Sequence, residues 1–268
     1  MAIDIRGSRI VITGAGSGIG HAAAVHCAGR GGEVIAVDID AGAAGATAEA
    51  CRQLHGSAHA HTCDVADGEA VAALAARIEG EHGPVDVLVS NAGVGMAGPF
   101  LEGSIQDWQW LRGVNVDGVV HSCHAFGQAM AERRRGHLVN IASMAGYVPS
   151  ASLATYCTSK AAVIMFSQCL RADLASRGVG VSAVCPGVID TPIATNTRLV
   201  GSMAGKRGQV IRAFRHGHSP EAVAKAIVRA VEHDRELVPV GIEAGTARQL
   251  LRIAPGPVRG LVARLRLD

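Results

Sequence analysis

The stretch RIVITGAGSGIGHAAAVHCA, residues 9–28, joins a short apolar strand to a helix through a loop rich in glycine. Glycine is needed where a backbone turns sharply or approaches a phosphate closely. The first turn of the following helix offers free N–H groups and the positive end of the helix dipole to such a phosphate. A tight strand-to-helix turn would also use glycine, so the loop predicts a dinucleotide site only in the right surroundings: a strand before it, a helix after it and an acidic residue further on.

The rest of the chain repeats this alternation of strand and helix. The expected strands are rich in Val and Ile and are bounded by Gly, Asp or Pro. They cover residues 9–14, 33–38, 58–64, 85–90, 137–143, 180–186 and 236–241. The expected helices follow a 3.6-residue period. They cover residues 41–54, 67–82, 105–134, 158–177 and 219–232.

Several of these strands are apolar on both faces, as in a parallel sheet that helices cover on each side. No linker interrupts the alternation. The pattern predicts one α/β domain over residues 1–268. We expect a doubly wound, Rossmann-like fold with a seven-stranded, mostly parallel sheet, strand order 3-2-1-4-5-6-7, and helices on both faces.

Composition narrows the class of protein. Charged residues make up 18% of the chain and glycines number 34, which is typical of a compact globular protein. The net charge of +2 gives no reason to expect a nucleic-acid partner. No apolar run is long enough to span a bilayer, and the charges at Asp4, Arg6 and Arg9 argue against a signal peptide. Seven scattered cysteines without a C-x-x-C pair fit free thiols in a reducing compartment, so we expect a cytoplasmic protein.

Histidine is frequent, with twelve residues, and two of them stand in HAHTC at 59–63. His59 and His61 would share one face of the expected strand. No spaced second pair completes a tetrahedral ligand set, so the sequence predicts no metal site.

Asp38 ends the second expected strand, in VIAVDID. An acidic residue at this place binds the adenosine ribose hydroxyls and repels a 2′-phosphate. Residue 39 is Ile, so the basic residue that would favour NADP is absent from the adjacent position. Asp38 would otherwise only cap the next helix. We favour the ribose role and expect NAD, with NADP less favoured. Asp64 ends the third expected strand and either forms a turn or approaches the adenine.

Two spacings, T-G-x(3)-G-x-G at 13–20 and Y-x(3)-K at Tyr156–Lys160, together resemble the short-chain dehydrogenase/reductase family. The extended branch of that family has a different glycine spacing and a longer chain. The resemblance continues along nearly the whole sequence, and the order of the motifs makes it specific. The further motifs are NAG at Asn91–Gly93, VNVDG with Asn115, NIASMAG with Ser143 thirteen residues before Tyr156, and CPGVIDTPI with Pro186, Gly187, Ile189 and Thr191.

The resemblance implies an oxidoreductase with two sets of site residues. The implied catalytic set is Asn115, Ser143, Tyr156 and Lys160. The implied cofactor contacts are Gly14, Ser17, Gly18, Ile19, Gly20, Asp38, Ile39, Asp64, Val65, Asn91, Ala92, Gly93, Tyr156, Lys160, Pro186, Gly187, Ile189 and Thr191. It further implies that Asn115 holds a water that relays protons to Lys160, and that the protein is a homodimer or homotetramer.

The chemistry of Tyr156 depends on its surroundings. A free tyrosine has a pKa near 10, too high for a good base at neutral pH. A lysine ammonium and the positive nicotinamide ring both favour the phenolate. At positions i and i+4 of a helix, Tyr156 and Lys160 share one face, so we expect Lys160 to lower the pKa of Tyr156. Ser143 ends a strand at the edge of the sheet where ligands bind, so its hydroxyl would hold the substrate oxygen.

Tyr156 taken alone would be an ordinary helix residue that packs with a polar tip. The combined motifs favour the catalytic role. The other tyrosine, Tyr147, is expected in a loop that lines the substrate cleft, or only packs there.

Residues 192–218 correspond to the segment that covers the substrate in the family. This lid carries five basic residues and no acidic one: Arg198, Lys206, Arg207, Arg212 and Arg215. It also carries Leu199, Val200, Met203, Val210, Ile211 and Phe214. We favour an apolar inner face with a solvated basic outer face. The other interpretation is a lid that meets an anionic substrate such as an acyl-CoA thioester.

Residues 242–268 form a C-terminal extension that departs from the ending of the family's ketoacyl reductases. It looks more like the members that act on lipophilic alcohols and ketones, such as steroid and retinol dehydrogenases. A basic amphipathic tail could contact a membrane surface or a partner subunit, or complete the core. The common ending supports tetramer contacts, so dimer and tetramer both stay open.

Three functions follow from these observations. The favoured one is an NAD(H)-dependent oxidoreductase with Tyr156 as general acid/base, which interconverts a secondary alcohol and a ketone, or a primary alcohol and an aldehyde, on a lipophilic small molecule. The second is a 3-oxoacyl or 3-hydroxyacyl-CoA oxidoreductase. The third is a non-catalytic, dinucleotide-binding regulatory protein, which has no need of all four residues of the catalytic set.

Overall fold

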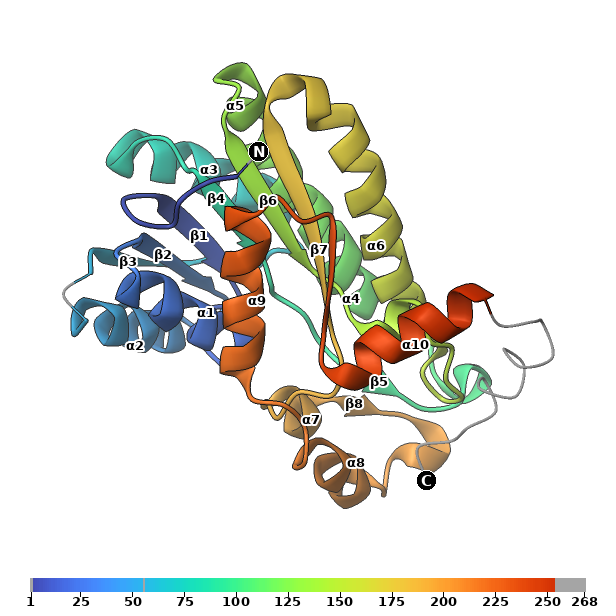
Figure 1. The fold of residues 1–268 in the computed structure, drawn as a ribbon. Helices are drawn as coiled ribbons and strands as arrows, with labels where there is room; N and C mark the ends of the chain where they lie inside the picture. Colours follow the sequence, from blue (N-terminus) through green and yellow to red (C-terminus); the bar gives the residue numbers. More distant parts are fainter. Residues whose placement is uncertain (1, 55, 254–268) are drawn as a thin grey trace.

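Seven parallel strands form the central sheet of the computed structural model, which describes residues 2–54 and 56–253 (Figure 1). From edge to edge they are β3 (Ala58–Thr62), β2 (Glu33–Asp38), β1 (Arg9–Thr13), β4 (Val87–Ser90), β6 (Gly136–Ile141), β7 (Val179–Pro186) and β9 (Leu237–Val240). This order confirms the predicted one, because the two short strands β5 (Met96–Ala97) and β8 (Arg198–Leu199) form a separate parallel pair. Two-residue strands are too short to show a periodic pattern in the sequence.

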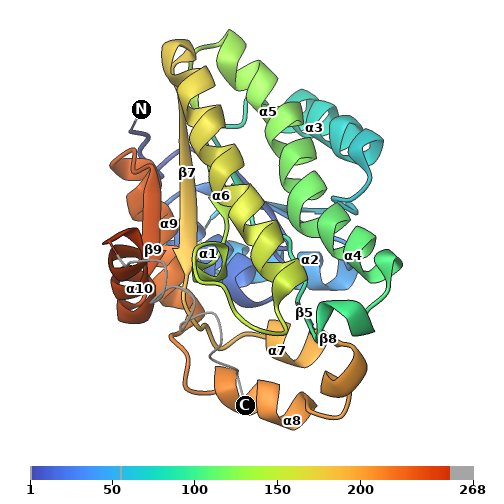
Figure 2. The ribbon, with the colours of Figure 1, turned by 90° about the vertical axis from the view of Figure 1, so that its right-hand side faces the viewer.

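Helices cover both faces of the sheet, as predicted. One face packs against α1 (Gly18–Gly29), α2 (Ala41–Arg52) and α9 (Pro220–Glu232). The other packs against α3 (Gly68–His82), α5 (Gly118–Glu132) and α6 (Ala154–Leu174), which lie in front in Figure 2.

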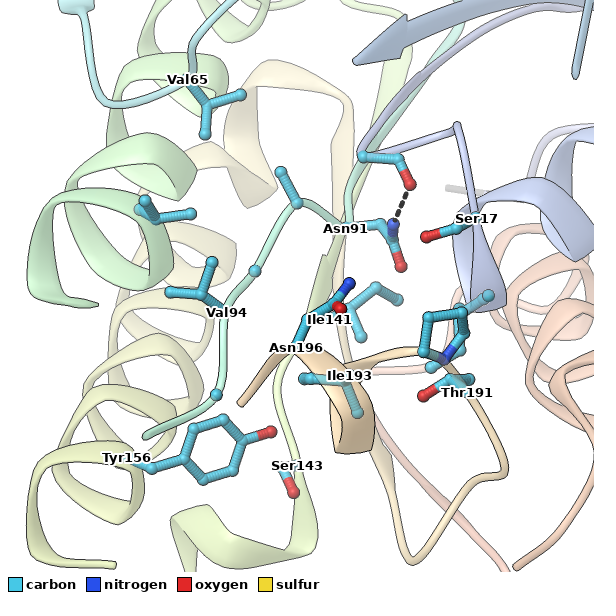
Figure 3. A pocket seen from close by; sticks show the side chains of 18 of the residues that line it. Ser17, Val65, Asn91, Val94, Ile141, Ser143, Tyr156, Thr191, Ile193 and Asn196 are labelled. Carbon is cyan, nitrogen blue, oxygen red and sulfur yellow. Dashed lines mark hydrogen bonds between the residues drawn. The ribbon is translucent and has the colours of Figure 1, made fainter. Parts of the chain in front are cut away.

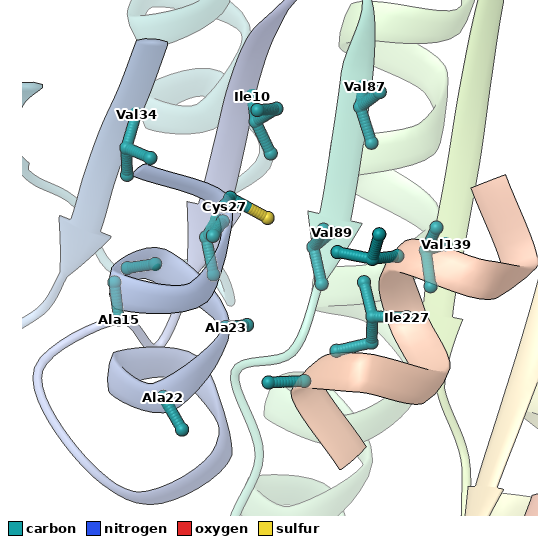
Figure 4. Packing of buried hydrophobic residues seen from close by; sticks show 14 of the residues in the cluster. Ile10, Ala15, Ala22, Ala23, Cys27, Val34, Val87, Val89, Val139 and Ile227 are labelled. Carbon is teal, nitrogen blue, oxygen red and sulfur yellow. The ribbon is translucent and has the colours of Figure 1, made fainter. Parts of the chain in front are cut away.

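The alternation of side chains along each strand supplies both cores. On β1, Ile10 and Ile12 join the core under α1 and α9, while Val11 joins the opposite one. Figure 4 shows Ile10 with its neighbours in the first core, among them Ile227 of α9. Burying each such side chain contributes about 1.5–3 kcal/mol to the stability of the fold. This packing keeps the carboxyl ends of the strands in register next to the lid.

The helix expected over residues 105–134 is interrupted. It divides into α4 (Ile105–Arg112), a π-helical turn η2 (Gly113–Asp117) and α5. A reciprocal capping box between Ser104 and Asp107 begins α4. The π turn carries Asn115, and such turns are frequent at functional sites. Helix α6 begins at Ala154, four residues before the expected position 158, so Tyr156 lies in its first turn.

The lid lies below the carboxyl ends of the strands in Figure 1. It contains α7 (Ile193–Asn196), β8, the 3₁₀ turn η5 (Gly201–Met203) and α8 (Arg207–Phe214). Outside the lid, the described residues also form the 3₁₀ turns η1 (Phe100–Glu102), η3 (Met144–Gly146) and η4 (Ala175–Arg177).

The predicted C-terminal extension begins with α10 (Ile242–Ile253). The hypotheses about residues 254–268 lie outside the described residues. No helix that the structure describes has the length and apolar character needed to cross a membrane.

Candidate active site

One cavity of about 580 Å³ opens at the carboxyl ends of the strands. It is lined by every residue of the two predicted sets except Gly20 and Asn115. Figure 3 shows the side chains of its lining, including Ser17 on one side and Tyr156 on another. The sequence motifs therefore meet at one place, although they come from distant parts of the chain.

The glycine loop is held by contacts between backbones. Gly14 has φ +62° and Gly18 has φ +52°, values that other residues rarely adopt. A Cβ on Gly14 would lie 2.7 Å from the Cα of Ala92. Asn91 locks this approach, because its Nδ2 donates to the carbonyls of Thr13 (2.9 Å) and Gly14 (3.0 Å). A Cβ on Gly20 would lie 2.1 Å from the Gly14 carbonyl oxygen, so Gly20 supports the loop from below and does not line the cavity.

The start of α1 fits a phosphate group. Ser17 is the N-cap residue, and its side chain makes no capping hydrogen bond. Ser17, Gly18 and Ile19 all line the cavity, so the first N–H groups of the helix and the positive dipole end face it. The residues of this half of the cavity therefore fit a dinucleotide cofactor.

Asp38 ends β2 and lines the cavity. Its carboxylate accepts hydrogen bonds from the N–H groups of Gly16 (2.8 Å) and Asp40 (3.1 Å). The alternative role as a helix cap belongs to another residue, since Asp40 caps α2 by accepting from the N–H of Ala43. Ile39, 67% exposed, also lines the cavity. Asp64 lines it too and forms a turn by accepting from the N–H of Ala66 (2.9 Å).

Lys160 is buried beside Tyr156. Its Nζ donates to the carbonyl of Ile141 (3.0 Å) and lies 5.9 Å from the centroid of the Tyr156 ring. Burial lowers the pKa of Lys160 to about 8. Burial also raises the pKa of Tyr156 to about 12, while a hydrogen bond with the Ser143 hydroxyl acts in the opposite direction. In the protein alone the pKa of Tyr156 is therefore raised, not lowered as the pairing with Lys160 predicts, because desolvation dominates.

Ser143 follows β6, and Figure 3 shows its side chain beside that of Tyr156. Its Oγ accepts from the N–H of Ala145 (3.1 Å), which orients the hydroxyl at the start of η3. The two hydroxyl groups therefore border the same part of the cavity, where a substrate oxygen could contact both.

Asn115 is fully buried behind the cavity wall. Its Oδ1 accepts from the N–H of Val94 (2.8 Å), and its Nδ2 donates to the Val94 carbonyl (3.0 Å) and contacts Ser159 Oγ (3.3 Å). Asn115 thus fixes the wall segment at Val94, which does line the cavity.

The lining also contains residues that the motifs did not predict. They are mostly apolar or amide side chains of the substrate side: Val94, Gln109, Trp110, Ile193, Asn196 and Phe214. Phe214 belongs to the lid that was expected to have an apolar inner face, whereas no motif indicated Trp110. Tyr147 does not belong to this lining, and its hydroxyl donates to the carbonyl of Ala244 in α10 (2.8 Å).

Two of the five basic residues of the lid bind other parts of the protein. Arg198 pairs with Asp107 (2.7 Å) and stacks at 3.8 Å over the Trp110 ring. Arg207 donates to the carbonyls of Thr195 and Thr197. Within the described part of the chain, none of the five basic lid residues lines the cavity, whereas Phe214 does.

The end of the lid is tied to α10. The N–H of His218 donates to the Val188 carbonyl (2.8 Å), and its ring contacts the Glu243 carboxylate (2.9 Å). Glu243 also accepts from the N–H of Val188 (3.2 Å). The first turn of α10 therefore packs next to Gly187, which lines the cavity.

Comparison with known proteins identifies similar sequences and structures. The sequence profile of the short chain dehydrogenase family matches residues 8–200. The probable oxidoreductase EphD of Mycobacterium tuberculosis is 43% identical over 266 residues, 96% of this chain and 45% of that protein. The chain thus spans about half the length of that curated relative.

Two further similarities extend over most of both chains. The D-threitol dehydrogenase of Mycolicibacterium smegmatis is 36% identical over 231 residues, 84% of this chain and 86% of the other. The crystal structure of a short chain dehydrogenase/reductase from Burkholderia phymatum in complex with NAD superposes with a TM-score of 0.88 at 32% identity, covering 95% of this chain and 98% of that one.

Proposed function

The chain belongs to the short chain dehydrogenase family, and from that premise we propose that it is an NAD(H)-dependent oxidoreductase that interconverts a secondary alcohol and a ketone, or a primary alcohol and an aldehyde, on a lipophilic small molecule. The observation that carries the proposal is the meeting of Ser143, Tyr156 and Lys160 in the same cavity as the glycine loop and Asp38. One end of the cavity can hold a dinucleotide, and the other can hold the reacting oxygen.

Tyr156 is the general acid/base. With a pKa of about 12 in the protein alone, its hydroxyl is protonated at neutral pH and can donate to a ketone oxygen that Ser143 holds. A nicotinamide cofactor held in the cavity would supply or accept the hydride, and the positive charge of its oxidised ring would favour the phenolate. Lys160 is mostly charged at pH 7. Its Nζ lies 5.9 Å from the centroid of the Tyr156 ring and adds a second positive charge there. Asn115 supports the wall beside Lys160, and a water relay through it remains part of the proposal.

NAD is the proposed cofactor because Asp38 and Ile39 line the cavity and would present a carboxylate and an aliphatic side chain to the ribose. Asp38 would accept hydrogen bonds from ribose hydroxyls and would repel a 2′-phosphate. Ile39 offers no positive charge to a phosphate. The bound NAD in the Burkholderia phymatum protein is consistent with this choice.

A neutral, lipophilic substrate fits the far end of the cavity. Val94, Trp110, Ile193 and Phe214 line it, and the cations of Arg198 and Arg207 are engaged elsewhere. Apolar lining with a few polar groups is typical of small-molecule sites. An acyl-CoA thioester would need lid cations that face the cavity, so we place that function second.

A substrate panel tests the proposal. Neutral secondary alcohols and ketones of increasing size, and 3-hydroxyacyl-CoA thioesters, are offered with NAD(H) and NADP(H) while NADH absorbance is followed. We expect turnover of neutral substrates with NAD(H). Turnover of thioesters alone would support the second function, and tight NADH binding without any turnover would support a regulatory protein.

A further inference from the structure

Three histidines and two glutamates gather at the free edge of the sheet, outside the cavity lining. His59 and His61 alternate along the edge strand β3, opposite Ile35 and Val37 of β2. Because Ile35 and Val37 belong to the core under α3, both histidines face that helix. His82, the last residue of α3, lies against them. The sequence suggested only the strand pair, since the third histidine comes from a separate element.

The ring nitrogens and carboxylate oxygens form two groups that share His82, and each group is compact enough to hold an ion. The His59 and His82 ring centroids are 4.0 Å apart, and those of His61 and His82 are 5.9 Å apart. The ligand atoms of Glu33, His59 and His82 all lie within 4.8 Å of one another. So do those of His61, Glu81 and His82. His82 is common to both sets.

The polar atoms of this cluster are poorly satisfied. The Nε2 atoms of His61 and His82 are buried, and neither has a hydrogen-bond partner among the residues that the structure describes. His82 Nε2 has the Glu81 carboxylate 3.7 Å away, and His59 Nε2 has Glu33 at 3.6 Å and Ser57 Oγ at 3.4 Å. An unsatisfied buried nitrogen costs about 1–3 kcal/mol. A bound cation would remove that cost.

Side chains of both charges surround the cluster. Burial lowers the pKa of both His59 and His61. Glu33 and Glu81 supply negative charge. Arg9, Arg52 and Arg77 supply positive charge nearby, but Arg9 binds the other oxygen of the Glu33 carboxylate (2.8 Å), which leaves Oε1 toward His59.

We propose that His82, together with His59 and His61 and the carboxylates of Glu33 and Glu81, binds one divalent transition-metal ion of the zinc class per chain. A mixture of imidazole and carboxylate ligands favours Zn²⁺, whereas Mg²⁺ and Ca²⁺ prefer oxygen ligands alone. The ion fastens the edge strand β3 to the end of α3. It takes no part in the reaction at the cavity.

Metal titration of purified protein without a polyhistidine tag tests this site. Zn²⁺ binding is measured by calorimetry, and Co²⁺ serves as a spectroscopic probe of the ligands. We expect one ion per chain, and a melting temperature that rises with Zn²⁺. In His82→Gln, the affinity for Zn²⁺ should fall by at least about tenfold, because even changes to residues that only support the metal ligands cost this much. The rise of the melting temperature with Zn²⁺ should disappear.

The matched control is His124→Gln, which changes an exposed histidine of α5 whose ring contacts Gln128 (3.3 Å). It should bind Zn²⁺ like the unaltered protein, while His59→Gln and His61→Gln each weaken binding. Unchanged affinity in His82→Gln would overturn the site, and so would an intense thiolate-to-cobalt absorption band, which indicates cysteine ligands. A cooperative melting transition of every variant without Zn²⁺ shows that the chain is folded, and this control does not depend on the proposed function.

Discussion

The two ends of the cavity are built in different ways. The cofactor end is made by the backbone: two glycines with positive φ, the uncapped start of α1 and the carbonyls that Asn91 holds. The substrate end is made by side chains from distant segments, such as Trp110 of α4 and Phe214 of α8. A backbone site restricts residue type and spacing tightly, whereas a side-chain site can be built by many sequences. Substitutions at the two ends should therefore affect different properties of the protein, and by different amounts.

The largest effect on stability is expected at the glycine loop. Gly14→Ala combines a positive φ with a Cβ 2.7 Å from the Ala92 backbone, so the free energy of unfolding should fall by at least about 3 kcal/mol. Gly7 is the control, because it has φ +73° but nothing lies within 4 Å of a Cβ built there. Gly7→Ala should lower the free energy of unfolding by only about 1–2 kcal/mol. Urea unfolding measures both. Equal losses would show that close backbone approach does not shape the cofactor end.

Cofactor selectivity should depend on a single side chain. Asp38→Ala removes the charge that repels a 2′-phosphate, so the preference for NAD over NADP should fall roughly 30- to 100-fold. The control is Asp40→Ala, which removes the cap of α2 and should cost about 1 kcal/mol of stability without changing selectivity. The measurement is the ratio of kcat/KM with NAD to kcat/KM with NADP for each variant. A selectivity that Asp38→Ala leaves unchanged would assign discrimination to another residue.

The buried Lys160 should make stability depend on pH. Its pKa falls from 10.5 in the unfolded chain to about 8 in the fold, so the unfolded state binds more protons between these values. Stability should therefore rise with pH from about 8 toward 10, by roughly 1–3 kcal/mol. Burial raises the pKa of Tyr156, which opposes the rise only above pH 10.

Melting curves of the apo protein and of Lys160→Met across this pH range measure the effect by difference, so that other titrating groups cancel. The rise should be absent from Lys160→Met. Parallel curves for the two proteins would contradict the assignment.

The smallest effect is expected in the lid. Arg198→Gln removes a partly exposed ion pair and a cation–π contact, together about 1 kcal/mol. KM for a neutral substrate should rise about fivefold, with KM for NAD unchanged. Arg212→Gln, at an exposed lid position, is the control and should change neither constant. If Arg212→Gln instead raised KM for a CoA thioester, the lid would be meeting an anionic substrate.

The difference between backbone-built and side-chain-built parts of the molecule also explains what could be predicted from the sequence. The sheet order, the glycine loop and the residues from Asp38 to Thr191 follow motifs, because parallel strands bring their carboxyl ends to one edge. The π turn at Asn115 was missed, since its sequence still follows a helical period. The raised pKa of Tyr156 was also missed, because desolvation depends on how the cavity packs. The position of His82 beside β3 depends on the packing of α3, which no spacing encodes.

The central claim is that Tyr156 transfers the proton, and the two tyrosines of the chain provide the test. Turnover and NADH affinity are measured for Tyr156→Phe, with Tyr147→Phe as the control outside the cavity. We predict that Tyr156→Phe lowers kcat by about 10²- to 10⁴-fold while the Kd for NADH stays within about twofold. Tyr147→Phe should keep its turnover and lose about 1 kcal/mol of stability with its bond to Ala244. A Tyr156→Phe variant that keeps more than about a tenth of the turnover would contradict the account.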